Sequence, residues 1–175
     1  MTSSSSRKQL GGPASATLSI PDINVWLALA APEHMHAALA RQWWEQHDGL
    51  IAFSRLSQLG FLRLTTTAAA MDSKPLTMDE AWQVYDRFYD DERVTFVSET
   101  EDAEKRFREN AVGRVASPKQ WADAWLLAIA HAAGGVMVVP SSATEQGHAS
   151  ITRRTRKADR TLRTLQDLSA RRVAR

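Results

Sequence analysis

Two aspartates, Asp22 and Asp123, lie in stretches that are otherwise mostly apolar. Asp22 directly precedes such a run, 23–30, and Asp123 is the only acidic residue between Glu109 and Glu145. An ionised carboxylate in an apolar setting is costly unless it is paired, bound to a metal or exposed. Two such carboxylates, with water completing the coordination, suit a hard cation such as Mg²⁺. We therefore expect the two aspartates to meet and hold a divalent metal ion; the alternative is that each caps a helix or bonds backbone amides.

The elements that must position these residues alternate along the chain. Compact apolar runs predict strands, and spacing of three to four residues predicts helices. The predicted strands are 18–21, 50–53, 93–97 and 136–139, and the predicted helices are 36–47, 54–64, 77–88, 101–110 and 119–133. Ser54 is a candidate N-cap, and Thr77 with Glu80 fits a capping box. No element is predicted for the apolar run 24–30, which breaks at Ala31-Pro32.

This alternation predicts an α/β fold with a mostly parallel sheet covered by helices on both faces. Ligand sites of such sheets lie at the carboxyl ends of the strands. Asp22 comes directly after the first predicted strand, as a site of this kind requires.

Composition and charge divide the chain into three parts. Residues 1–16, rich in Ser, Gly and Ala, predict a flexible extension, and residues 17–142 predict one domain. Residues 143–175 predict a basic, disordered or irregular tail. Nine Lys and Arg and two Asp lie between Gly147 and Arg175. The pI of about 9.2 therefore comes from the tail and does not indicate that the domain binds nucleic acid. The tail's arginines could contact RNA phosphates, but a solvated extension is the simpler interpretation.

Several classes of protein are excluded or disfavoured. The chain has no Cys, which excludes disulfides and thiolate metal sites. No apolar run approaches the roughly 20 residues of a membrane span, and the N-terminus lacks the apolar region of a signal peptide, so a cytoplasmic protein is expected. No P-loop or Gly-x-Gly-x-x-Gly occurs, so nucleotide cofactors are not expected. His34, His36 and His47 lie near one helix without a ligand set for zinc.

Three motifs together resemble the PIN-domain family, in particular the VapC-type toxins of toxin–antitoxin pairs. The first is Asp22-Ile-Asn-Val-Trp-Leu-Ala-Leu, the second is Ser54-Arg-Leu-Ser-Gln58-Leu-Gly-Phe-Leu-Arg63, and the third is Ala122-Asp123-Ala-Trp-Leu-Leu-Ala-Ile-Ala. The resemblance covers Leu18 to Val139. It implies a three-layer α/β/α fold, a Mg²⁺- or Mn²⁺-dependent endoribonuclease, a VapB-like antitoxin as partner, and a homodimer.

The resemblance also implies roles for individual residues. Asp22 and Asp123 would bind the metal, which would polarise a phosphate oxygen and generate a hydroxide-like nucleophile. Gln58 would join them as a third catalytic residue; the alternative is that it is only a polar residue on a helix face. Asn24, in the first motif, and Arg63, at the end of the second, would contact the RNA. A surface ion pair is the alternative for Arg63.

The chain departs from the family pattern at two places. Gln58 stands where the family commonly has Glu, and an amide adds no negative charge toward a metal. Ser141 stands in Val139-Pro140-Ser141, where the family has Thr-Phe-acid. The tail that follows offers no apolar run, so the chain is expected to lack the family's usual C-terminal strand.

A shift of reading frame is one hypothesis for the second departure. Codons ACC TTC GA(N), for Thr-Phe-acid, preceded by GT and read out of register, give GTA CCT TCG. These codons encode Val-Pro-Ser, the residues at 139–141. Inspection of the coding sequence tests the idea, which fails if no other frame continues the family pattern.

Three functions remain in competition at this point. The leading one is an RNA-cleaving toxin with the Asp22–Asp123 metal site. The second is a catalytically impaired PIN-like domain that only binds antitoxin or RNA, which Gln58 and the missing acid favour. The third is a metal-free α/β binding module. The sequence names neither the RNA target nor the antitoxin.

Overall fold

The computed structural model of the chain describes residues 17–112, 117–118, 120–141 and 150–154. The expected extension at 1–16 and the tail after residue 154 lie outside this part. The elements, in chain order, are β1 (Ser19–Pro21), α1 (Ile23–Ala30), α2 (Ala37–Gln46), β2 (Ile51–Ser54), α3 (Arg55–Thr65), α4 (Met78–Arg87), the 3₁₀ turn η1 (Phe88–Asp90), β3 (Val94–Val97), α5 (Glu101–Ala111), α6 (Gln120–Ala132), β4 (Val136–Ser141) and β5 (Ser150–Arg154). In the described residues, no helix combines the length and hydrophobicity needed to span a membrane.

The five strands form one sheet in the order β3-β2-β1-β4-β5. The strands β1 to β4 are parallel, with Ser19 opposite both Ile51 and Val136. Because β2 and β4 lie on either side of β1, the chain passes from one half of the sheet to the other around the central strand. The topological switch therefore lies at β1, directly before Asp22.

The expectation that the chain lacks its C-terminal strand is wrong. Residues 150–154 form β5, which pairs antiparallel with β4 and sets Ser141 opposite Ser150 and Met137 opposite Arg154. The expectation relied on the absence of an apolar run. An edge strand is held by main-chain hydrogen bonds, which residues of any type except proline supply in full, so it needs no such run. The sheet thus continues into the segment predicted to be a tail.

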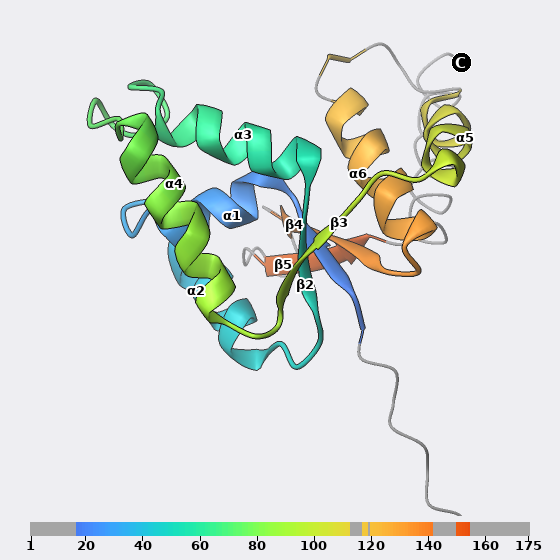
Figure 1. Ribbon diagram of the computed structural model, residues 1–175, viewed down its shortest axis with the longest axis horizontal. Helices are drawn as coiled ribbons and strands as arrows, with labels where there is room; N and C mark the ends of the chain where they lie inside the picture. The colour runs from blue at the N-terminus through green and yellow to red at the C-terminus, as the bar shows by residue number, and fades with distance from the viewer. Residues whose placement is uncertain (1–16, 113–116, 119, 142–149, 155–175) are drawn as a thin grey trace, which may run out of the picture.

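Helices cover both faces of the sheet, which confirms the three-layer α/β/α prediction. Figure 1 shows α1 to α4 on one side of the strands and α5 and α6 on the other. Consecutive residues of β2 point to opposite faces: Ile51 and Phe53 join one core cluster, with Trp26, whereas Ala52 joins the other, with Leu126. This period of two is what a strand buried on both faces requires.

Capping residues start two of the helices as predicted. The Ser54 hydroxyl accepts a hydrogen bond from the Ser57 N–H, 3.2 Å, at the start of α3. The Thr77 hydroxyl accepts from the Glu80 N–H at 3.3 Å, and the Glu80 carboxylate accepts from the Thr77 N–H at 2.8 Å. Both are capping boxes, which satisfy N–H groups that have no partner inside the helix.

One helix, α1, is missing from the predicted elements. It occupies the apolar run after Asp22, and Val25, Trp26, Leu27 and Ala28 are all buried in it. A helix buried on most of its circumference shows no polar face, so its sequence carries no helical period. Its start lies close to α3, where a β-carbon added to Gly60 would lie 2.4 Å from Ile23 Cδ1. Glycine at position 60 thus allows the two helices to approach beside Asp22.

Candidate active site

Parallel strands bring three of the predicted site residues to one edge of the sheet. Asp22 follows the end of β1, and Gln58 lies in the first turn of α3, directly after β2. Asp123 lies in the first turn of α6, which returns to β4. Because a crossover helix runs antiparallel to its strands, the start of α6 lies at their carboxyl ends. Three helix N-termini and their positive dipole ends therefore lie at the same edge.

Asp22 is held in place by hydrogen bonds to both of its carboxylate oxygens. As N-cap of α1, it accepts from the Val25 N–H at 2.9 Å through Oδ1, and from Asn24 Nδ2 at 3.4 Å through Oδ2. Its own N–H donates to the Val138 carbonyl at 2.8 Å. The side chain is only 9% exposed. Asp22 therefore does serve as a cap, and the side-chain bond to its second oxygen is the longer of the two.

Electrostatics link Asp22 to Asp123 across the sheet edge. Burial raises the pKa of the Asp22 carboxyl above its usual value. Hydrogen bonds from Val25 and Asn24 oppose this increase, whereas the negative charge of Asp123 adds to it. The Asp123 side chain is half-buried. The fold thus brings the two carboxylates within electrostatic range of each other, in a setting where a second negative charge is unfavourable.

Gln58 is buried at the start of α3, with a side chain 7% exposed. Its described hydrogen bond is to Arg55, whose Nη1 donates to Gln58 Oε1. The Arg55 guanidinium also lies over the Phe96 ring, 5.0 Å from the ring centre. The amide oxygen of Gln58 is therefore turned toward the positively charged guanidinium of Arg55. Arg55, which we did not predict as a site residue, sets its orientation.

The two predicted RNA-binding residues have different positions. Asn24 contacts Asp22 and lines the hollow around it. Arg63 lies in the last turn of α3 with an exposed side chain. At a rise of about 1.5 Å per residue, it is roughly 7 Å further along the helix than Gln58. Of the two, the fold brings only Asn24 against Asp22.

A hollow of about 310 Å³ opens beside Asp22. It is lined by Asp22, Asn24, His34, Met35, His36 and Pro140. The two histidines come from the loop between α1 and α2, where the His36 N–H donates to His34 Nδ1 at 3.2 Å. Burial, and then the neighbouring His36, lower the pKa of His34, which favours the neutral imidazole. Neither histidine could be predicted from the sequence as a neighbour of Asp22, because loop residues carry no periodic signal.

The side chains at this edge suit a hard cation that keeps much of its water. The described residues contain no group of three His, Cys, Asp or Glu side chains arranged to hold a metal ion. Mg²⁺ commonly needs only one or two carboxylates, with water and substrate phosphate in the other positions. Asp22 and Asp123 provide that number, and a cation between them would relieve the unfavourable charge. The donors are oxygen atoms, as Mg²⁺ or Mn²⁺ prefers.

Asp22→Asn is expected to raise the free energy of unfolding of the metal-free protein at neutral pH. Because the pKa of Asp22 is raised on folding, its contribution to stability is full below the unfolded-state pKa and is lost as pH rises through the folded-state pKa. Asn does not titrate and is an equally good N-cap. Urea unfolding from about pH 4 to pH 8 measures the difference, which should widen with pH. A variant no more stable than the original protein at any pH would contradict this account.

Known proteins resemble the chain in both sequence and fold. No family model matches it. Ribonuclease VapC41 of Mycobacterium tuberculosis, from strains CDC 1551 / Oshkosh and ATCC 25618 / H37Rv, is 38% identical over 131 residues, which cover 71% of this chain and 90% of that protein. The crystal structure of VapBC2 from Rickettsia felis, bound to a DNA fragment from their promoter, matches with a TM-score of 0.51 and 12% identity, covering 69% of this chain and 86% of that one. Mycobacterium tuberculosis VapC20, described as a sarcin-ricin loop cleaving toxin, gives a TM-score of 0.49 at 16% identity, covering 67% and 84%. The identity over nearly the whole of VapC41, together with the three motifs and the three-layer fold, shows that this chain belongs to the VapC family of PIN-domain toxin ribonucleases.

Proposed function

We propose that this chain is a Mg²⁺-dependent endoribonuclease toxin that hydrolyses phosphodiester bonds of RNA. Membership of the VapC family supports a ribonuclease of a toxin–antitoxin system. The metal dependence is carried by one observation: Asp22 is buried with a raised pKa, and the charge of Asp123 contributes to that increase. A divalent cation between the two carboxylates would stabilise the ionised form of Asp22.

The residues at the sheet edge have different roles in the proposed hydrolysis. Asp22 and Asp123 would hold the cation, and the hydrogen bond from Asn24 orients Asp22. When bound, the cation polarises a phosphate oxygen and lowers the pKa of a water ligand. The helix N-termini at this edge favour the negatively charged phosphate. Gln58, in the first turn of α3, would be the third catalytic residue. In-line attack by water then requires positioning and charge neutralisation, without a covalent intermediate.

Removal and return of the metal test this proposal. Protein treated with EDTA and then dialysed is incubated with RNA, with and without Mg²⁺ or Mn²⁺. Cleavage should be absent in EDTA and return with either cation. Cleavage that persists in EDTA would overturn the metal dependence but would leave the ribonuclease assignment standing.

A second candidate is a PIN-type domain that binds RNA or antitoxin with impaired catalysis. The neutral Gln58, bonded to Arg55, favours it, because one negative charge fewer weakens the attraction for a cation. Gln58→Glu should then raise the cleavage rate at low Mg²⁺, by about tenfold if the added charge contributes one charge-assisted contact. The Arg55 guanidinium can donate a hydrogen bond to the new carboxylate, as it does to the Gln58 amide oxygen. Rates measured across a Mg²⁺ titration decide the matter, and an unchanged or lower rate for Gln58→Glu would argue against this role for the position.

We also propose a VapB-like antitoxin as partner, a homodimer as the assembly and the cytoplasm as the site of action. The solved VapBC2 supports the first, because it pairs toxin and antitoxin. Co-expression of this chain with the product of a short adjacent gene, followed by size-exclusion chromatography with light scattering, measures both assemblies. Elution of the chain as a monomer, separate from the product of the adjacent gene, would contradict both the homodimer and the antitoxin complex.

A further inference from the structure

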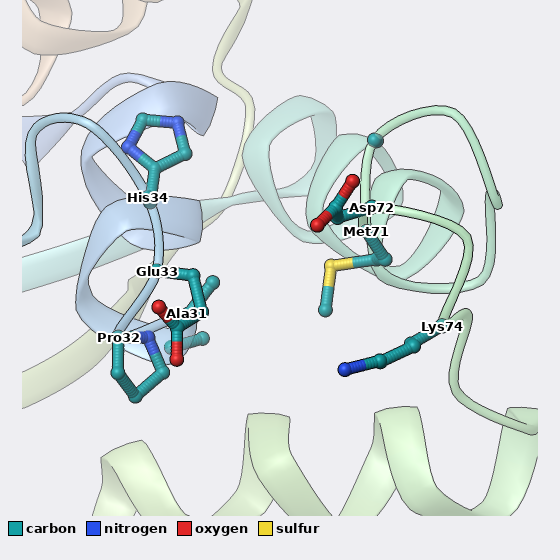
Figure 2. A pocket seen from close by; sticks show the side chains of 9 residues that line it. Ala31, Pro32, Glu33, His34, Met71, Asp72 and Lys74 are labelled. Atoms are coloured by element: carbon teal, nitrogen blue, oxygen red, sulfur yellow. The ribbon is translucent and has the colours of Figure 1, made fainter.

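A second pocket, of about 240 Å³, lies between two loops on the side of the sheet that α1 to α4 cover. One wall is the end of α1 and the loop after it, and the other is the loop between α3 and α4. The lining residues are Ala30, Ala31, Pro32, Glu33, His34, Ala70, Met71, Asp72 and Lys74. Figure 2 shows Met71 and Lys74 reaching from the second loop toward Ala31, Pro32 and Glu33 on the first.

This pocket adjoins the candidate active site. His34 lines both the pocket and the hollow beside Asp22, so the two spaces meet at this residue. A nucleotide whose phosphate lies at Asp22 would have its base or that of its neighbour within reach of the pocket. All of the residues that line the pocket lie outside the three family motifs.

The walls combine apolar surfaces with charged groups at the opening. Alanine, proline and methionine side chains form most of the lining, and Glu33, Asp72 and Lys74 are exposed at its edge. The volume lies below the roughly 300–1,000 Å³ of pockets for drug-sized ligands. A flat ring system with apolar faces and a polar edge matches such a space.

The second loop holds its shape at a conformational cost. Asp72 and Ser73 have φ of 47° and 64°, in the left-handed region that few residues other than glycine adopt. The Ser73 N–H donates to the Ala68 carbonyl at 2.8 Å, and the Lys74 N–H donates to the Met71 carbonyl at 2.9 Å. Strained backbone of this kind concentrates at functional sites.

We propose that this pocket binds one nucleobase of the RNA, on a nucleotide next to the phosphate that is cleaved. The proposal rests on the ribonuclease function proposed above. The carboxylates of Glu33 and Asp72 accept hydrogen bonds from exocyclic amino groups, which adenine, cytosine and guanine carry and uracil lacks. The pocket therefore favours amino-bearing bases over uracil.

The charges at the opening argue against other small occupants. Two carboxylates against one ammonium repel a phosphate, so the backbone of the RNA is not what the pocket takes. A purely apolar side chain of a protein partner would leave all three charged groups without hydrogen bonds to it. Proteins ordinarily recognise an RNA sequence by binding unpaired, single-stranded bases.

Binding of nucleoside monophosphates to the full chain tests the proposal without requiring catalysis. AMP, GMP, CMP and UMP are titrated into ¹⁵N-labelled protein with the amide signals of Met71, Asp72 and Lys74 as readout, and ribose 5-phosphate is the control ligand. AMP, GMP and CMP should shift these signals at lower concentration than UMP, and ribose 5-phosphate should not shift them. Equal shifts by ribose 5-phosphate, or none by any nucleotide, would overturn the proposal.

Two neighbouring alanines supply a matched pair of variants. Ala70→Leu fills the pocket, whereas Ala69→Leu makes the same change at an exposed position outside the lining. Ala70→Leu should weaken AMP binding by about tenfold or more, because it removes the apolar surface that the base would cover, and Ala69→Leu should not. Asp72→Asn keeps the left-handed conformation, which Asn tolerates, and should reduce the preference for CMP over UMP.

The outcomes separate this proposal from the ribonuclease function. Base-dependent shifts that Ala70→Leu abolishes support the pocket even if the chain cleaves no RNA. An active ribonuclease with monophosphate binding unchanged in Ala70→Leu overturns the pocket and leaves the function intact.

Discussion

Asp123→Asn is expected to reduce RNA cleavage by at least about a hundredfold, and Asp22→Asn by a similar factor. Loss of a group that only supports a metal ligand commonly costs 10- to 100-fold, so loss of a ligand itself should cost no less. Each change removes one negative charge and keeps the shape of the side chain. Because Asn remains a good N-cap, α1 should still begin at residue 22 in the first variant.

Single-turnover cleavage of a labelled RNA by the purified variants measures the effect. Asp48→Asn is the matched control, since it makes the same chemical change at an exposed residue before β2, at the opposite edge of the sheet. That variant should cleave as the original protein does. If all three variants cleave equally, the observed activity does not come from the site at Asp22 and Asp123.

Phe53→Ala is expected to lower the free energy of unfolding by about 3–5 kcal/mol, a large part of the roughly 5–15 kcal/mol of a typical domain. Phe53 is fully buried in β2. Its ring stacks on Trp26 with 3.5 Å between ring centres and an angle of 14°, and also packs against Tyr85 at 4.8 Å. The substitution therefore leaves a cavity beside the rings of Trp26 in α1 and Tyr85 in α4.

Chemical denaturation measures this change. Trp82→Ala is the control, because Trp82 is 43% exposed and its loss should cost much less. If Phe53→Ala is too unstable to purify, Phe53→Leu keeps most of the apolar volume and should lose about 1–2 kcal/mol. A Phe53→Leu protein as stable as the original would contradict the view that this ring organises the cluster.

The Trp26–Phe53 stack also has a consequence for the active site. Trp26 lies four residues after Asp22 in α1, so the stack fixes the helix that Asp22 caps to the strand that leads into α3 and Gln58. Packing in this cluster therefore positions two of the site residues. Phe53→Leu should for this reason lower cleavage more than stability alone would predict.

Elements with a local signal could be predicted from the sequence. The four parallel strands and five of the helices follow from runs of apolar residues and from caps such as Thr77 with Glu80, which act within a few residues of the chain. Two elements could not. The helix α1 is too buried to have a polar face, and β5 is held by main-chain bonds to β4 rather than by its own hydrophobicity.

The Asp22–Asp123 pair shows what each level of structure decides. The sequence by itself determined the fold class, the two carboxylates in apolar surroundings and their place after a strand and at the start of a helix, because parallel strands send such positions to one edge. Only the tertiary structure decided that Asp22 is buried with a raised pKa and that Gln58 bonds Arg55. It also decided that His34 lines both the Asp22 hollow and the pocket beside the loop between α3 and α4. Burial, electrostatic coupling and loop contacts depend on segments far apart in the chain, so no local pattern of residues carries them.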